Sequence, residues 1–110
     1  MEPLVSIIIH TRNSDKTLEK CLQSIKNQRY KNIEIIIVDQ ESEDNTLPIA
    51  KKFGVRIFSS PKSLFYNGPS RSRNIGAKNA YGEIFYHLDS DMELSENIIS
   101  ESVEIMPIHV

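Results

Sequence analysis

The stretch Glu83-Ile-Phe-Tyr-His-Leu-Asp-Ser-Asp91 joins an apolar run to a pair of carboxylates. The run from Ile84 to Leu88 predicts a β-strand, and Asp89 and Asp91 follow it at positions i and i+2. Because residues i and i+2 of a strand point to the same side, we expect both carboxylates to face one cation at the carboxyl end of this strand. Open α/β sheets bind their ligands at that edge.

Further apolar runs predict the other strands of a sheet. Leu4 to Ile9 and Ile33 to Val38 are apolar almost throughout and rich in β-branched residues, which is typical of parallel strands buried on both faces. Val55 to Phe58 predicts a shorter strand. We expect the polar segment from His10 to Ser14 to break the first run, and Asp39 to follow the second.

Helical patterns separate these strands. Leu18, Cys21, Leu22 and Ile25 recur at helical spacing, and Asn13, Ser14 or Asp15 can cap this first helix. The other predicted helices begin at Asn45 or Thr46 and end at Gly54, begin near Pro69 or Ser70 and run to about Ala80, and run from Ser95 to Met106. The alternation predicts a three-layer α/β/α sandwich with a mainly parallel, Rossmann-like sheet.

Composition narrows the class of protein. The chain has 110 residues, of which 39% are hydrophobic and 25% charged, and this suits one compact globular domain. A net charge of −2 gives no support for non-specific nucleic-acid binding. The single cysteine, Cys21, lies on the apolar side of its helix, so we expect a core residue in a reducing compartment rather than a catalytic or metal-binding thiol. No apolar run approaches a membrane span, so we expect a cytoplasmic protein, with association at a membrane surface left open.

Polar side chains follow three of the predicted strands at the ends where they meet. The residues are Thr11, Arg12 and Asn13 after the first strand, Asp39 after the second, and Asp89 and Asp91 after the fourth. Carboxylate oxygens suit hard cations, and Mg²⁺ often takes one or two protein carboxylates and completes its shell with water and substrate phosphates. The arrangement therefore predicts a site for Mn²⁺ or Mg²⁺ together with a phosphate-bearing ligand.

Five segments, in order, resemble the N-terminal, nucleotide-sugar-binding half of a family 2 glycosyltransferase with the GT-A fold. They are the opening strand and threonine-x-asparagine turn from Val5 to Asn13, the first helix from Leu18 to Gln28, the acid-and-serine loop from Glu34 to Asp39 with Ser42, Asp44 and Thr46, the arginine-asparagine-x-glycine helix start Ser72-Arg-Asn-Ile-Gly76, and a D-x-D metal motif at Asp89-Ser-Asp91.

The resemblance implies a role for each candidate residue. Asp39 would accept a hydrogen bond from the nucleotide base. Asp91 would ligate Mn²⁺ or Mg²⁺, and Asp89 would contact the ribose, the metal or its water shell. The nucleoside pocket would be lined by Thr11, Arg12 and Asn13. Arg73, and with it Arg71, would lie near the base or diphosphate. The implied reaction moves a sugar from a UDP or GDP donor to an unknown acceptor hydroxyl, with inversion at the anomeric carbon.

The resemblance also implies what lies elsewhere. In this family the acceptor site and general base follow the D-x-D motif, and Glu93, Glu96, Glu101 and Glu104 look like solvated charges, so the catalytic base stays unassigned. On this interpretation residues 1–110 form a single GT-A-type domain, incomplete at its C-terminus, that self-associates as a homo-oligomer through the segment from Ser95 to Val110. The alternatives are a non-catalytic nucleotide- or metal-binding or regulatory protein, and a nucleotidyltransferase.

Four features depart from the family pattern or stay ambiguous. His10 stands where a proline is usual, and Gln40-Glu41 replaces an aspartate-glycine pair. We expect His87 to be packed or hydrogen-bonded rather than a ligand. The segment from Tyr66 to Gly68 is either a flap over the nucleotide or a surface turn.

Overall fold

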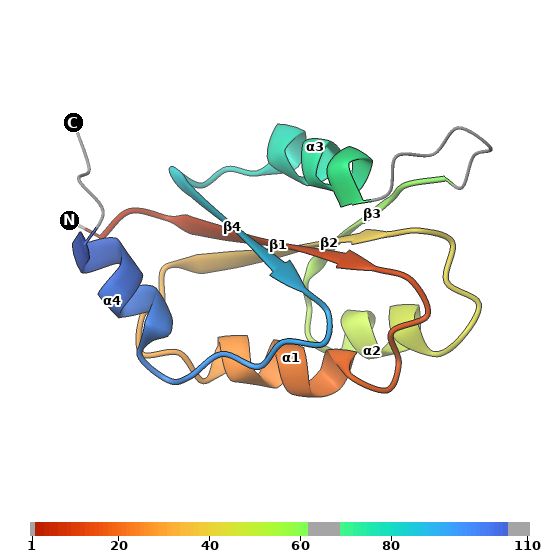
Figure 1. The fold of residues 1–110 in the computed structure, drawn as a ribbon, viewed down its shortest axis with the longest axis horizontal. Coiled ribbons are helices and arrows are strands. Elements are labelled where there is room, and N and C mark those ends of the chain that lie inside the picture. The colour runs from red at the N-terminus through yellow and green to blue at the C-terminus, as the bar shows by residue number, and fades with distance from the viewer. Residues whose placement is uncertain (1, 62–68, 106–110) are drawn as a thin grey trace.

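Four parallel strands form one sheet in the computed structural model, which describes residues 2–61 and 69–105. The strands are β1 (Val5–Thr11), β2 (Ile33–Asp39), β3 (Arg56–Ser59) and β4 (Ile84–Asp89), in the order β3-β2-β1-β4. Every pairing is parallel, so all the carboxyl ends lie along one edge (Figure 1). The predicted strands and their parallel arrangement are confirmed.

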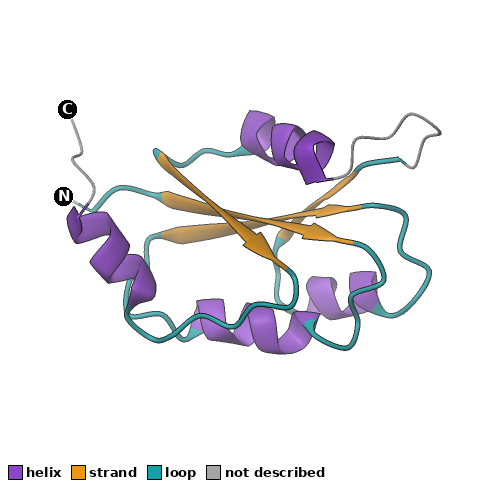
Figure 2. Cartoon of the chain, viewed as in Figure 1, coloured by secondary structure: helices purple, strands orange, loops and turns teal. Residues whose placement is uncertain are grey.

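Helices cover both faces of this sheet, as predicted (Figure 2). α1 (Leu18–Lys26) and α2 (Thr46–Lys52) lie on one face, and α3 (Pro69–Asn79) lies on the other. α4 (Ile98–Ile105) lies at the end of the α1 layer, where Ile99 joins the core. The predicted Met106 end of this helix and the Tyr66–Gly68 segment lie outside the described residues.

Two apolar layers hold the sandwich together. The larger one packs the α1 and α2 side, where Cys21 is 0% exposed and burial raises the pKa of its thiol to about 11. The smaller one joins Ile8, Ile36 and Val38 to the underside of α3. β1 and β2 are thus buried on both faces, and Cys21 is a core residue, as the pattern predicted.

The strands run further than their apolar residues indicated. Thr11 pairs with Asp39 in register, and His10 pairs with Asp89. The expectation that His10 and Thr11 break the first strand is therefore wrong. Backbone N–H and C=O groups inside a sheet need partners whatever the side chain, so the hydrogen-bond ladder continues through these polar residues.

The predicted helix caps are also partly wrong. α1 starts at Leu18 with Thr17 at the N-cap position, one turn after the predicted caps, and Thr17 makes no side-chain cap bond. At α2 the capping bond comes from Asp44, whose Oδ1 accepts the N–H of Thr46 at 2.9 Å, rather than from Asn45. Gly54 ends α2 as predicted, with a φ of 65°.

Candidate functional site

A buried carboxylate, Asp39, forms the centre of the carboxyl edge. Its Oδ1 accepts hydrogen bonds from the hydroxyls of Thr11 and Ser42, both at 2.6 Å, and its Oδ2 accepts the Ser42 N–H at 2.9 Å. Asp39 is 3% exposed and Thr11 is 0% exposed. Because each carboxylate oxygen can accept two hydrogen bonds, Oδ2 has capacity for one more donor.

The loops after β1 and β2 hold each other in place beside Asp39. The Asn13 N–H donates to Ser42 Oγ at 2.8 Å, and Asn13 Oδ1 accepts the Glu43 N–H at 2.8 Å. Asn13 has a φ of 47° and Glu41 a φ of 48°, in the left-handed region that glycine favours. Glu41 stands where the resemblance expects glycine, so this loop keeps a glycine-like backbone at a cost of about 1 kcal/mol.

The loop after β4 differs from the prediction. The strand ends at Asp89, and the Met92 N–H donates to Asp89 O at 3.1 Å, which closes a turn containing Asp91. Asp89 influences the pKa of His10 on the α3 side, whereas Asp91, after burial, is a cause of the raised pKa of Cys21 in α1. Asp91 therefore lies in a turn and not in the strand, so the expectation that it extends β4 is wrong, and the shared cation of Asp89 and Asp91 stays a prediction.

This turn is nevertheless joined to the rest of the edge. Ser90 Oγ donates to Ser14 Oγ at 2.9 Å, which connects the β4 turn to the loop after β1. The structure thus brings Thr11, Asn13, Asp39 and the Asp89–Asp91 turn to one edge, as predicted.

A small pocket of about 120 Å³ lies at this edge on the α3 side of the sheet. Burial lowers the pKa of His10, with Asp89 and Asp39 opposing the shift and Arg73 adding to it. Burial also lowers the pKa of His87, again with help from Arg73. Both imidazoles are therefore mainly neutral at pH 7, and the charged groups of the pocket are Arg73 and Asp89. Its lining residues are Ile8, His10, Arg73, His87, Leu88, Asp89 and Met92.

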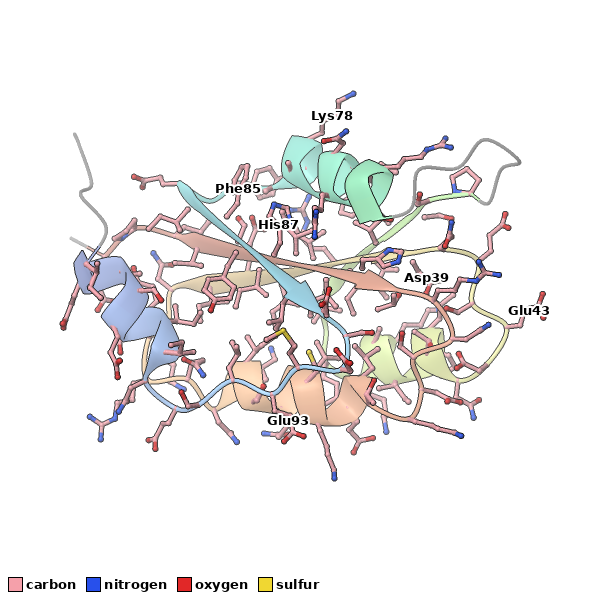
Figure 3. All side chains as sticks on the ribbon, in the orientation of Figure 1. Asp39, Glu43, Lys78, Phe85, His87 and Glu93 are labelled. Atoms are coloured by element: carbon pink, nitrogen blue, oxygen red, sulfur yellow. The ribbon has the colours of Figure 1, made fainter. Side chains whose placement is uncertain are left out.

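The remaining predicted residues lie as follows. Arg12 is exposed in the loop after β1, and Arg71 is exposed on α3. His87 is an exposed residue in the pocket wall, on the α3 side of β4 (Figure 3), so the expectation of a packed side chain is wrong. Sequence reasoning did not place His10 or Ser72 in the site, and their only signal was the histidine in place of the usual proline.

Asp89 and Asp91 are the candidate metal ligands, and both are exposed. Within residues 2–61 and 69–105, no group of three or more His, Cys, Asp or Glu side chains could hold a metal ion. Two exposed carboxylates match a cation that brings phosphates and water as its other ligands. The donor set therefore fits Mn²⁺ or Mg²⁺ only in company with a diphosphate.

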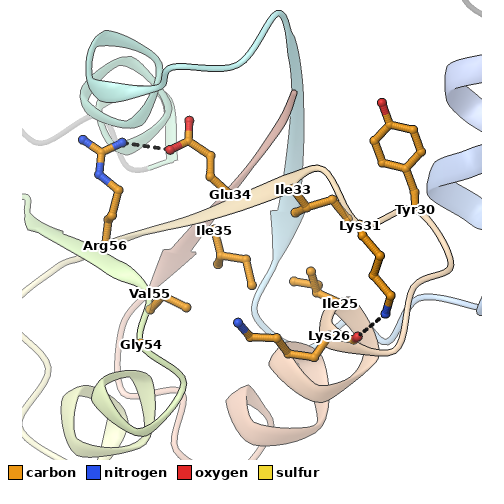
Figure 4. Close-up of a pocket in the computed structure, with 10 residues that line it drawn as sticks. All are labelled: Ile25, Lys26, Tyr30, Lys31, Ile33, Glu34, Ile35, Gly54, Val55 and Arg56. Carbon is orange, nitrogen blue, oxygen red and sulfur yellow. Dashed lines mark hydrogen bonds and ion pairs between the residues drawn. The ribbon is translucent and has the colours of Figure 1, made fainter. Parts of the chain in front are cut away.

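A larger pocket, about 250 Å³, lies at the opposite, amino-terminal edge of the sheet (Figure 4). Its carboxylate, Glu34, already accepts bonds from Ser6 Oγ at 2.5 Å, the Tyr81 N–H at 2.6 Å and Arg56 at 2.9 Å. Arg56 in turn lies 4.3 Å from the centre of the Tyr81 ring. These groups hold the turn after α3 on the sheet and have little capacity left for a ligand.

None of the helices in the described part of the chain is long and apolar enough to cross a membrane.

Comparison with known proteins agrees with the fold. The chain is 37% identical over 103 residues to UDP-Glc:alpha-D-GlcNAc-diphosphoundecaprenol beta-1,3-glucosyltransferase WfaP of Escherichia coli, covering 94% of this chain and 41% of the relative. It is 36% identical over 101 residues to GalNAc(5)-diNAcBac-PP-undecaprenol beta-1,3-glucosyltransferase of Campylobacter jejuni, covering 89% and 33%. The chain thus spans less than half the length of either relative.

A solved structure shares the architecture. S. aureus TarS 1–349 in complex with UDP-GlcNAc superposes with a TM-score of 0.80 and 28% identity, over 92% of this chain and 30% of that one. The four-stranded parallel sheet with its flanking helices matches this GT-A enzyme. The family model for glycosyl transferase family 2 matches residues 6–107. The chain therefore belongs to glycosyl transferase family 2.

Proposed function

We propose that this chain binds the nucleoside diphosphate of a nucleotide-sugar donor, as the donor-binding half of a glycosyltransferase. The observation that carries the proposal is the buried Asp39, held by Thr11 and Ser42 at the same edge as the Asp89–Asp91 turn. A UDP donor is favoured because WfaP is named for UDP-Glc and TarS was solved with UDP-GlcNAc.

Asp39 recognises the base. Its Oδ2 has room for one further hydrogen bond, which suits a ring N–H of uracil or guanine. Thr11 and Ser42 hold the carboxylate in position, so the base meets an acceptor that is already oriented. Arg12 and Asn13 line the nucleoside side of the pocket.

Asp91 and Asp89 would hold a divalent cation when the diphosphate is present. The cation would be Mn²⁺ or Mg²⁺, and it would supply Lewis-acid stabilisation of the departing diphosphate. Arg73 lies beside Asp89 in the α3-side pocket and adds a fixed positive charge near the phosphates, a role for which the exposed Arg71 is the alternative.

The acceptor hydroxyl attacks the anomeric carbon from the face opposite the leaving group, which inverts the configuration. This attack needs a base near the hydroxyl. Glu93, Glu96, Glu101 and Glu104 are exposed, and Glu96 lies 3.6 Å from Arg29 in a solvent-exposed ion pair. We therefore place the base and the acceptor site in the part of a family member that this chain does not match, and treat residues 1–110 as a single donor-binding domain.

Nucleotide binding is tested by thermal unfolding with UDP and GDP, each with and without Mn²⁺. A ligand at a hundred times its Kd stabilises the native state by about 2.7 kcal/mol, so a clear rise in Tm is expected with one of the two. Asp91→Ala should abolish the effect of Mn²⁺ and keep the fold, whereas Glu101→Gln, an exposed acid on α4, should change neither. No shift with either nucleotide at millimolar concentration would refute the proposal.

Binding without transfer is a separate outcome. If UDP binds but no sugar leaves a UDP-sugar in the presence of a polyprenyl-diphosphate sugar acceptor, the non-catalytic alternative gains support. Release of diphosphate from a nucleoside triphosphate would instead favour a nucleotidyltransferase.

A further inference from the structure

We propose that His10 and Ser72 form a positioning pair, which fixes the first turns of α3 on β1 and thereby presents Arg73 to the phosphates. The inference rests on the proposed nucleotide site and adds to it two residues that bind no part of the donor themselves.

The contact between the two residues is direct, and it joins a buried serine to a half-buried histidine. His10 Nδ1 lies 2.9 Å from Ser72 Oγ, and Ser72 is 0% exposed. His10 is the penultimate residue of β1 and lies on the α3 side, so the bond joins a central strand to the start of a helix. A buried hydroxyl left without this partner would be costly, which favours one fixed arrangement of the two elements.

A second contact between β1 and α3 lies one helical turn further along; we call this line of contact, formed by Ile8 and His10 with Ser72 and Gly76, the seam. Gly76 packs against Ile8, so closely that a Cβ built on Gly76 would lie 2.3 Å from Ile8 Cγ2. Residues 8 and 10 share one face of β1, and residues 72 and 76 share one side of α3. The apolar contact sets the distance of the helix from the sheet, and the polar contact adds a directional restraint at the end nearer the site.

Arg73 depends on this seam because it follows Ser72 directly. Its side chain is exposed and lines the small pocket with His10, His87 and Asp89. A long exposed side chain loses conformational entropy when it binds an anion, and a fixed helix start reduces the part of that loss that comes from the backbone. His10 and Ser72 therefore act through Arg73 and not by touching the donor.

The test is a set of double-mutant cycles read by calorimetric titration with UDP. His10→Ala and Ser72→Ala are each measured alone and together with Arg73→Ala. We expect each single change to weaken UDP binding about tenfold, the equivalent of one well-placed hydrogen bond, and to have less than about a twofold effect once Arg73 is absent. His10→Asn, whose amide reaches the Nδ1 position, should retain most of the affinity, and Lys78→Ala on the outer side of α3 is the control (Figure 3).

A loss of affinity that is the same with and without Arg73 would overturn the inference, as would no loss at all. Amide hydrogen exchange of α3 gives a readout that needs no nucleotide. His10→Ala and Ser72→Ala should speed exchange in the first turns of the helix, and His10→Asn should not. If exchange is unchanged, the pair does not hold the helix and the inference fails even where UDP binds. If exchange rises but the unmodified chain binds no UDP, the proposed function fails instead.

Discussion

At the scale of single residues, Gly76 marks the closest approach of α3 to the sheet. Gly76→Ala would place a Cβ 2.3 Å from Ile8 Cγ2, and Ile8 is 2% exposed and cannot move aside freely. We expect the change to lower the free energy of unfolding by about 1–3 kcal/mol, since overpacking a close contact forces the backbone or side chains to shift. Urea unfolding measures the loss, with Lys78→Ala on the exposed side of the same helix as the control, and an unchanged midpoint for Gly76→Ala would contradict the packing described here.

Asp39→Asn tests the centre of the site. Asparagine replaces one carboxylate oxygen by an NH₂ group, which cannot accept the bonds from Thr11, Ser42 and the base together. We expect UDP affinity to fall at least about tenfold and the free energy of unfolding to fall by about 1–2 kcal/mol. Titration calorimetry and urea unfolding separate the two effects. Glu43→Gln, an exposed neighbour, should change neither, and full affinity in Asp39→Asn would remove Asp39 from the base-binding role.

The sequence predicted which residues lie at this edge better than it predicted their contacts. The location of Thr11 and Asp39 at the carboxyl edge was predicted because each comes after a buried apolar run. The Thr11–Asp39 bond joins residues 28 apart, and the His10–Ser72 bond joins residues 62 apart. Such pairs depend on strand register and helix position, which local patterns of hydrophobicity do not specify.

At the scale of the elements, the sequence pattern predicted that β4 continues to Asp91, which is two residues too far. Asp91 reads as a strand residue from its spacing, but β4 stops at Asp89 and a turn follows. β4 lies at the edge of the sheet, so only β1 provides a ladder to extend it. The predicted caps of α1 were wrong for a related reason. The side chains of Asn13 and Asp15 accept N–H groups of the loop after β2, and Ser14 Oγ bonds to Arg12 and Ser90, instead of capping α1.

Glu34 makes the joint between β2, β3 and the turn after α3 sensitive to acid. Burial raises the pKa of Glu34, but hydrogen bonds from Ser6, Tyr81 and Arg56 outweigh burial, so the pKa lies below its ordinary value of 4.5. The carboxylate therefore contributes stability that is present above pH 4.5 and is lost as the pH falls below that value.

Glu34→Gln should remove this dependence. We expect the change to lower the free energy of unfolding by about 2 kcal/mol near pH 7. In acid the two chains should converge, because Glu34 of the unmodified chain is then protonated and as uncharged as glutamine. Urea unfolding at several pH values measures the difference. Glu83→Gln provides an exposed comparison, and parallel pH curves for Glu34→Gln and the unmodified chain would refute the explanation.

At the scale of the whole molecule, the alternation of strands and helices along the chain was enough to predict the three layers. Self-association stays a prediction. Ile105 at the end of α4 is 81% exposed and lies in the segment predicted to form the interface. Ile105→Glu should therefore reduce any concentration-dependent rise in mass seen by sedimentation velocity. A constant monomer mass for the unmodified chain would refute the predicted homo-oligomer. Residues 106–110 belong to the predicted interface and lie outside the described part of the chain.

The strand order also has a consequence for synthesis on the ribosome. β1 pairs with β2, which is synthesised next, but its other neighbour is β4. Val5 therefore cannot pair with Ile84 until the fourth strand has been synthesised. A nascent chain that has released only β1, β2 and their loops already contains every residue of the Thr11–Asp39–Ser42 cluster. The Asp89 turn joins it only when nearly the whole segment has emerged. The two halves of the pocket are thus completed at different times, and the half proposed to hold the cation comes last.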